Sequence, residues 1–170
     1  MFANLLERSL NDLVFPSVVL TVSGGHNELY LWQSLYSWKL LGETRDDAGG
    51  EAFDKVAKAM GLGFPGGPIL DRLAQEYMVN TEINSKRSDR EFLFPVPLLE
   101  TTSLDFSFSG LKSAVKREID LRIANGRGIE NTLNLMGILP LVDIQEIAYE
   151  FQKSIIEVFS IKLARAVSQT

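Results

Sequence analysis

The sequence feature that most constrains the fold is a β-branched run that stops at two glycines. Residues 18–22 are short, apolar and rich in valine, as expected of a buried strand, and Gly24-Gly25 follow them. Apolar runs at residues 28–32 and 37–42 complete a set of three. The short links between these runs predict three successive antiparallel strands, of which the first two form a hairpin that turns near the glycines.

Helical periodicity replaces the strand pattern after the third run. Residues 48–60 carry an apolar stripe and, on another face, a polar stripe that includes Asp54, and Gly61 suits the end of a helix. Further helices are predicted to begin at Pro68, at Ser109 and at Asp143. Strands that precede helices in this order predict an α/β fold.

Three weaker patterns add detail to this outline. Apolar residues recur at near-helical spacing within residues 1–14, which predicts a short lead-in helix. Residues 105–110 alternate in polarity like a strand. Asp143 and Glu146 have the spacing of a capping box, which would begin the last helix.

Composition excludes several classes of protein. The 170 residues are 45% hydrophobic, which suits about one globular domain, and they include no cysteine and a single histidine, His26. Disulfides, a cysteine nucleophile and a zinc site built from histidines of this chain are therefore excluded. The lack of cysteine gives no sign of an oxidising compartment, so a cytoplasmic location is expected. No signal peptide or membrane span is predicted. The net charge of −5 does not fit a domain that binds nucleic acid by its overall field.

Each motif permits a functional and a purely structural interpretation. Ser23-Gly24-Gly25-His26 could bring backbone N–H groups close to a phosphate, or could be a plain hairpin turn. Asp54 could accept hydrogen bonds from ribose hydroxyls, or could lie on a solvated helix face. Gly66-Gly67 could touch a nucleoside or could simply form a turn. A further basic group could meet RNA phosphates or could occupy an exposed loop: Lys86, Arg87 and Arg90.

Four blocks together resemble one family, the bacterial type of tRNA threonylcarbamoyladenosine transferase (TsaD), formerly labelled a glycoprotease. They follow the order and spacing of that family over nearly the whole chain. The blocks are VSGGH at residues 22–26, LGETRDDAGGEAFDK at 41–55, FPGGP at 64–68 and DFSFSGLK at 105–112. Four linked motifs are more specific than any one glycine pair.

The resemblance implies an actin-like ATPase architecture of the ribonuclease-H-like type, with a nucleotide between two lobes. Residues 1–14 would then lead in from the preceding lobe, and residues 15–170 would be an incomplete second lobe. The implied substrate contacts are Thr21, Val22, Ser23, Gly24 and Gly25 in the hairpin, Asp54 on the ribose and Gly67 on the nucleoside, with Asp71 as a second ribose candidate.

The reaction implied by the resemblance is transfer of a threonylcarbamoyl group from threonylcarbamoyl-AMP to the N6 amine of the adenosine beside the tRNA anticodon. AMP, or ATP in its place, would bind as a ligand, and one iron or zinc ion would act as a Lewis acid. No nucleophilic side chain is implied, so no catalytic residue is assigned. The implied partners are tRNA and the bacterial proteins of the threonylcarbamoyl transfer complex.

The chain also departs from the family pattern. The paired metal histidines that normally precede the segment resembling residues 1–7 are absent, as are the later asparagine and the metal-binding aspartate. Val96, Gly49 and Ser113 replace an arginine, an alanine and a threonine. We therefore expect a central fragment that carries half of a ligand site and has no metal ligand of its own. Such a fragment should not catalyse turnover alone.

Two other functions compete with this hypothesis. The chain could be a non-catalytic module that pairs with an intact transferase, although a pure scaffold has no chemical need for Asp54 beside Gly67. It could also be a nucleotide-dependent kinase of the same superfamily. The old protease label fits least, because one histidine and no cysteine offer no closed zinc site.

Overall fold

The computed structural model describes residues 12–82, 92–98, 102–127 and 139–170. The predicted helix over residues 1–14 falls outside this part except for its last three residues, and the basic group at 86–90 falls outside it entirely. The division between a lead-in segment and a lobe over 15–170 therefore stays a prediction.

Three strands form one antiparallel sheet in the order β1-β2-β3. They are β1 (Ser17–Val22), β2 (Asn27–Ser34) and β3 (Ser37–Glu43). The register pairs Thr21 of β1 with Glu28, and Tyr30 with Leu40 of β3. All three predicted strands are confirmed, and so is the hairpin, whose turn is closed by a 3.0 Å hydrogen bond from Ser23 N to His26 O.

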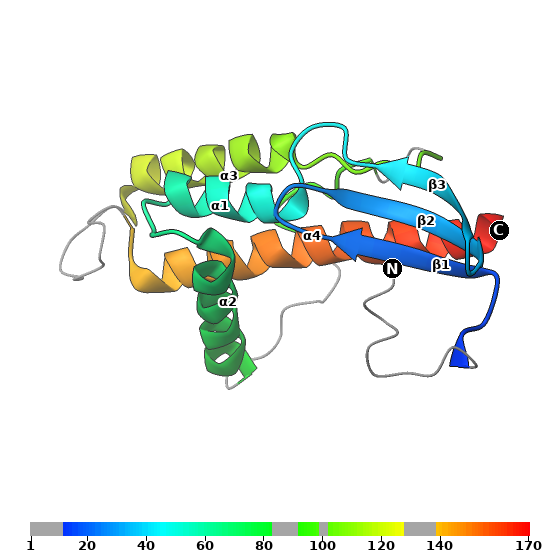
Figure 1. The fold of residues 1–170 in the computed structure, drawn as a ribbon. Helices are drawn as coiled ribbons and strands as arrows, with labels where there is room; N and C mark the ends of the chain where they lie inside the picture. The colour runs from blue at the N-terminus through cyan, green and yellow to red at the C-terminus, as the bar shows by residue number, and fades with distance from the viewer. Residues whose placement is uncertain (1–11, 83–91, 99–101, 128–138) are drawn as a thin grey trace.

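Four α-helices complete the described fold. They are α1 (Gly49–Ala59), α2 (Gly66–Glu82), α3 (Ser109–Arg122) and α4 (Leu141–Gln169), and a short kinked turn, η3 (Ile123–Arg127), follows α3, with non-helical backbone angles at Asn125 and Gly126. In Figure 1, α4 runs the length of the molecule, from the neighbouring helices α1 and α3 at one end to the sheet at the other, while α2 projects across it. None of the helices described is long and apolar enough to cross a lipid bilayer.

One hydrophobic core joins the helices to one face of the sheet. Leu29 of β2, Val56 of α1 and Phe151 of α4 are fully buried in it, together with Phe106 and Phe108 from the segment that precedes α3. Phe53 and Phe151 meet edge to face, with ring centroids 5.0 Å apart. The α/β fold class predicted from the sequence, antiparallel hairpin strands with packed helices, is therefore confirmed.

Three local predictions are wrong, each because a distant side chain determines the structure. Helix α2 begins at Gly66 and not at Pro68, since Asp54 of α1 accepts from Gly66 N. Residues 105–110 form a single bridge, from Phe106 to Thr44, and not a strand. The helix α4 begins at Leu141, and Asp143 binds the Arg122 guanidinium at 2.8 Å and does not start a capping box. Glu146 also pairs with Arg122, at 3.0 Å, so this ion-pair group joins α3 to α4.

We expect Phe151→Ala to destabilise the fold by about 3–5 kcal/mol, because it removes a fully buried ring from the centre of the core. Urea denaturation followed by circular dichroism measures the change. The matched control is Tyr36→Ala, since Tyr36 is 84% exposed and its loss should alter stability by only about 0.5 kcal/mol. Equal effects of the two substitutions would contradict the assignment of Phe151 to the core.

Candidate functional site

The hairpin turn of VSGGH is shaped by its own serine. Ser23 Oγ donates to His26 O and accepts from His26 N, both at 2.9 Å. Gly24 and Gly25 are exposed at the tip, and a Cβ on either would meet nothing within 4 Å. Their backbone can therefore be approached from outside the molecule, as a phosphate or another anionic group would require.

The strand residues that lead into this turn occupy different environments. Thr21 is half-buried, and its hydroxyl donates to Glu28 O at 3.2 Å across the strand pair. Val22 is 55% exposed beside the turn. Thr21 is therefore bound to the neighbouring strand, whereas Val22, Ser23 and the two glycines present the accessible surface.

Asn27, which sequence analysis did not single out, holds the hairpin to helix α1. It is fully buried, and its Oδ1 accepts a 2.5 Å hydrogen bond from Gly49 N in the first turn of α1. Its Nδ2 donates to His26 O at 3.0 Å, and its backbone N donates to Thr44 Oγ1 at 2.8 Å. Asn27 thus satisfies a free N–H at the start of a helix distant from it in sequence.

Close backbone contact brings the start of α1 against the hairpin. A Cβ on Gly50 would lie 2.7 Å from Gly24 Cα and 3.0 Å from Ser23 O. No other residue type fits there unless the two segments move apart. The glycine at position 50 therefore fixes the turn beside the first turn of α1.

Asp54 lies one helical turn beyond Gly50, on the same face of α1. Its Oδ1 accepts a 2.7 Å hydrogen bond from Gly66 N, at the start of α2. No partner of its second oxygen is found within the described part of the chain. One carboxylate oxygen therefore positions α2, and the other can accept from a ligand hydroxyl.

The glycine pair of FPGGP divides into a packed and an accessible residue. A Cβ on Gly66 would lie 2.6 Å from Ala57 Cβ and 2.7 Å from Phe53 O, so α1 and α2 meet there. A Cβ on Gly67 would meet nothing within 4 Å. The structure thus brings the hairpin turn, Asp54 and Gly67 together along one face of α1, although 42 residues separate Gly25 from Gly67 in sequence.

Asp71 has a different environment. Its Oδ1 accepts from Gln152 Nε2 of α4 at 2.9 Å, and its Oδ2 accepts from Gln75 Nε2 at 2.8 Å. Both carboxylate oxygens therefore have side-chain partners. This favours Asp54 over Asp71 as the acceptor for ribose hydroxyls.

The loop between β3 and α1 is held by Asp46. Its carboxylate accepts from the hydroxyls of Ser107, at 2.5 Å, and Ser109, at 2.8 Å. It also accepts from Phe108 N at 2.9 Å and Ser109 N at 3.3 Å. Partial burial opposes ionisation of Asp46, but these hydrogen bonds outweigh it and lower its pKa to about 2. Asp46 thus caps α3 from a distant loop, which explains why residues 105–110 do not continue as a strand.

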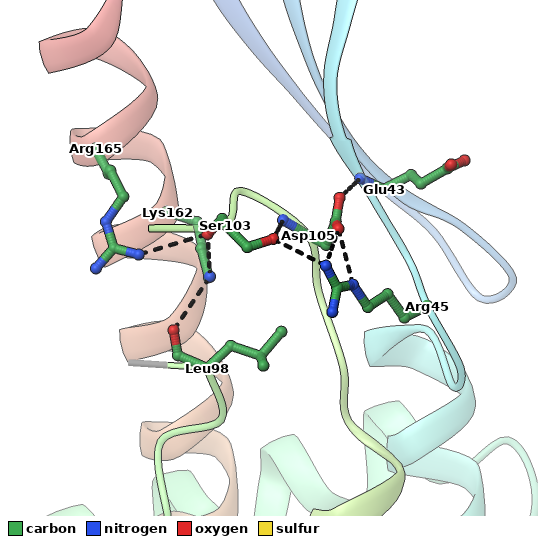
Figure 2. A network of polar contacts seen from close by, with 7 residues as sticks. All are labelled: Glu43, Arg45, Leu98, Ser103, Asp105, Lys162 and Arg165. Carbon is green, nitrogen blue, oxygen red and sulfur yellow. Dashed lines mark hydrogen bonds and ion pairs between the residues drawn. The ribbon is translucent and has the colours of Figure 1, made fainter. Parts of the chain in front are cut away.

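The segment before α3 is fixed further along by ionic contacts (Figure 2). Asp105 Oδ2 pairs with Arg45 at 2.7 Å, and Asp105 Oδ1 accepts from Glu43 N at 3.1 Å. On the other side, the Lys162 ammonium of α4 donates to the carbonyl oxygens of Leu98, at 3.2 Å, and of Ser103. Sheet, loop and α4 therefore share one polar network that supports the approach to α1.

Burial and neighbouring groups in this network shift the pKa values of Lys162 and Asp105. Burial lowers the pKa of Lys162, and the nearby positive charge of Arg165 lowers it further. Burial alone would raise the pKa of Asp105, but hydrogen bonds from Arg45, Glu43 and Ser103 lower it overall. The ionised Asp105 consequently anchors its segment to β3.

An open depression of about 290 Å³ lies beside Asp54, where α1 leads into α2. Its lining residues are Glu51, Asp54, Lys55, Lys58, Leu62, Gly63 and Phe64. Lys55 pairs with Glu51 at 2.9 Å and with Asp47. The lining of the depression therefore combines carboxylates, among them Asp54, with cations and one exposed aromatic ring.

The described residues do not fit an iron or zinc ion. No group of three or more His, Asp or Glu side chains among them could hold a metal ion, and cysteine is absent from the sequence. His26 is exposed next to the glycine turn. The metal implied by the sequence resemblance has no ligand set in this part of the chain.

Comparisons with known proteins agree on one family. The family model for tRNA N6-adenosine threonylcarbamoyltransferase matches residues 1–170. A relative of that name from Clostridioides difficile is 41% identical over 165 residues, which cover 97% of this chain and 41% of the relative. One from Bordetella pertussis is 44% identical over 156 residues, 92% of this chain and 39% of the relative. One from Staphylococcus aureus is 38% identical over 169 residues, 99% and 42% respectively.

The chain spans about two fifths of the length of the curated relatives it matches. The similarity covers each of the motifs that meet along α1, since it extends over nearly the whole chain. The region of similarity therefore includes the hairpin, Asp54 and the FPGGP turn.

Asp46 should make stability depend on pH in acid. Because its folded pKa is about 2 and its ordinary value is 3.8, its contribution is complete above about pH 4 and is lost as the pH falls towards about 2. Asp46→Asn should be less stable than the wild type near neutrality, and the difference should shrink across that window. Urea denaturation at several pH values measures it. Asp120→Asn is the control, because Asp120 is exposed on α3. A parallel pH profile for the two variants would contradict the role of Asp46.

Gly50→Ala should destabilise the chain, because its Cβ would collide with the backbone of Gly24. Thermal unfolding followed by circular dichroism measures the loss. Gly110→Ala is the matched control, since Gly110 is also in the first turn of a helix but has open space around it. There alanine should leave stability unchanged or raise it by about 0.4–1 kcal/mol. A Gly50→Ala protein as stable as Gly110→Ala would show that α1 does not depend on the close approach.

Proposed function

We propose that this chain, which belongs to the tRNA N6-adenosine threonylcarbamoyltransferase family, contributes one wall of the adenylate site in such a transferase. The observation that carries the proposal is the arrangement along α1. The accessible Gly24-Gly25 turn, the Asp54 carboxylate and the accessible backbone of Gly67 share one side of that helix. Each offers a different contact to the parts of a nucleotide.

The proposed chemistry is acyl transfer from threonylcarbamoyl-AMP to an adenosine of tRNA. The N6 amine of the adenosine forms a bond to the carbamoyl carbon, the bond from that carbon to the phosphate oxygen breaks, and AMP leaves. The amine loses one proton in the process. Because the leaving group is a phosphate anion, backbone N–H groups placed beside it would favour the products.

The residues of this chain would bind and orient the adenylate. Asp54 Oδ1 is bound to Gly66 N, so the carboxylate has a fixed direction and its second oxygen can accept from the ribose hydroxyls. The Gly24-Gly25 backbone would lie near the phosphate, together with Thr21, Val22 and Ser23 of the same hairpin. Gly67 would allow close approach of the nucleoside, because no Cβ stands in the way.

Other parts of the proposal lie outside this chain. The described residues lack a metal ligand set, so no step is assigned here to iron or zinc. The acceptor tRNA and the bacterial partner proteins of the threonylcarbamoyl transfer complex would complete the reaction, in the cytoplasm. The grouping of three separate motifs along α1 supports a ligand site over a scaffold that only contacts other proteins.

Isothermal titration calorimetry with AMP and with threonylcarbamoyl-AMP tests the proposal. Asp54→Asn preserves the size of the side chain and an oxygen for Gly66 N, but removes the charge that would hold the ribose. We expect it to weaken adenylate binding by roughly 10- to 150-fold, the usual range for a hydrogen bond to a charged group.

Asp71→Asn is the matched control, because both oxygens of Asp71 already bind glutamine side chains. It should leave the affinity for adenylates nearly unchanged. Absence of adenylate binding to the wild-type chain would contradict the proposed function. Equal losses of affinity in the two variants would contradict the role of Asp54.

A further inference from the structure

We propose that Phe64 and Lys58 form a subsite for one unpaired nucleotide of the acceptor RNA, with the base stacked on the Phe64 ring and the phosphate beside the Lys58 ammonium. The inference rests on the proposed function, because it takes RNA to be the acceptor. It assigns a role to two side chains that the adenylate site leaves unused.

The first observation is the exposure of Phe64. Phe64 is 83% exposed, although Gly66, two residues later at the start of α2, packs closely against α1. Phe64 belongs to the lining of the depression beside Asp54. A large ring held in water on a short, exposed link between two packed helices is a suitable platform for a planar apolar group.

The second observation is that Lys58 is the available cation of this depression. Lys55 is engaged by Asp47 and Glu51, and these carboxylates raise its pKa. Lys58, one turn further along α1, is exposed and takes part in no ion pair within the described part of the chain. A phosphate that enters the depression would therefore meet Lys58 without displacing an existing partner.

The shape of the depression favours a nucleotide of a polymer over a free small ligand. Its volume of about 290 Å³ is just below the roughly 300–1,000 Å³ found for small-molecule pockets. Such pockets usually enclose most of the ligand, whereas the Phe64 ring at an open rim offers contact from one side. One-sided stacking is adequate when the rest of the chain is held elsewhere, as for a base in single-stranded RNA.

The negative net charge of the chain limits the kinds of contact that it can make with RNA. At −5 the chain cannot attract RNA by its overall field. Stacking on an aromatic ring does not depend on that field, and a single lysine supplies the local charge for one phosphate. An aromatic ring next to an unpaired lysine is therefore a contact with RNA that an acidic chain can make.

Fluorescence anisotropy with a short, labelled single-stranded RNA containing adenosine tests the inference on the 170-residue chain. We expect Phe64→Ala to weaken binding by about 5- to 150-fold, the range for loss of one stacked base. Phe64→Trp should retain the affinity, because it keeps an aromatic face. Tyr36→Ala should also retain it, since Tyr36 is as exposed as Phe64 but lies in the β2–β3 turn, at the other end of the sheet from the glycine turn.

Lys58→Ala should weaken RNA binding. It should also reduce the slope of log affinity against log salt concentration by about one, as expected for the loss of one phosphate contact. Lys39→Ala, an exposed lysine of β3, is its control. Equal RNA affinities of Phe64→Ala and wild type would overturn the inference. So would a result in which Phe64→Ala weakens the binding of AMP and not of RNA, or one in which it only changes self-association measured by sedimentation.

Different results would contradict the RNA subsite and the proposed adenylate site. Adenylate binding that depends on Asp54, together with RNA binding that ignores Phe64, overturns the RNA subsite and leaves the adenylate site intact. RNA binding that depends on Phe64 in a chain that binds no adenylate supports the subsite and contradicts the proposed function.

Discussion

The contact between the glycine hairpin and the first turn of α1 is the constraint on which the rest of the site depends. It combines backbone contact, which Gly50 permits, with the buried hydrogen bond from Gly49 N to Asn27 Oδ1. A helix start buried without a partner would carry the full cost of an unsatisfied N–H. Asn27 removes that cost and, at the same time, fixes the sheet relative to α1. Every later element of the site takes its position from α1.

A second set of contacts fixes the loop between β3 and α1 and the segment before α3. The carboxylate of Asp46 holds the start of α3. Asp105, in the segment before α3, binds Glu43 N and the Arg45 side chain, and Lys162 of α4 binds the same segment. The two carboxylates act from opposite directions, because Asp46 belongs to the β3–α1 loop and Asp105 to the segment before α3. The result is that the loop leading into α1 is fixed by backbone and side-chain groups more than 50 residues away in the sequence. Ionised hydrogen bonds of this kind are stronger than neutral ones, and they hold a region where the backbone ladder consists of one bridge.

The sequence predicted what its local periodicity determines. The three strands and α1 lie within a residue or two of their predicted positions, because β-branched runs and an amphipathic stripe determine both. Long-range partners were not predictable. Helix α2 begins at Gly66 and not at Pro68, since Asp54 on another helix accepts its first N–H. Asp143 binds Arg122 in place of capping its own helix. Asn27 gave no local signal, because its partner at Gly49 is 22 residues away.

Helix α1 also determines the spacing between the groups proposed to bind the adenylate and the group proposed to bind RNA. At a rise of 1.5 Å per residue, Asp54 is about 6 Å along the axis from Gly50, and Lys58 is about 6 Å further. The turn for the phosphate, the carboxylate for the ribose and the cation for an RNA phosphate would therefore follow one another on a single rigid element. The proposed acyl transfer requires the two reactants to be neighbours in a fixed orientation, and both sets of proposed contacts on one helix would meet that requirement without a conformational change. The position of Phe64 also depends on α1, because Gly66, two residues after Phe64, packs closely against that helix.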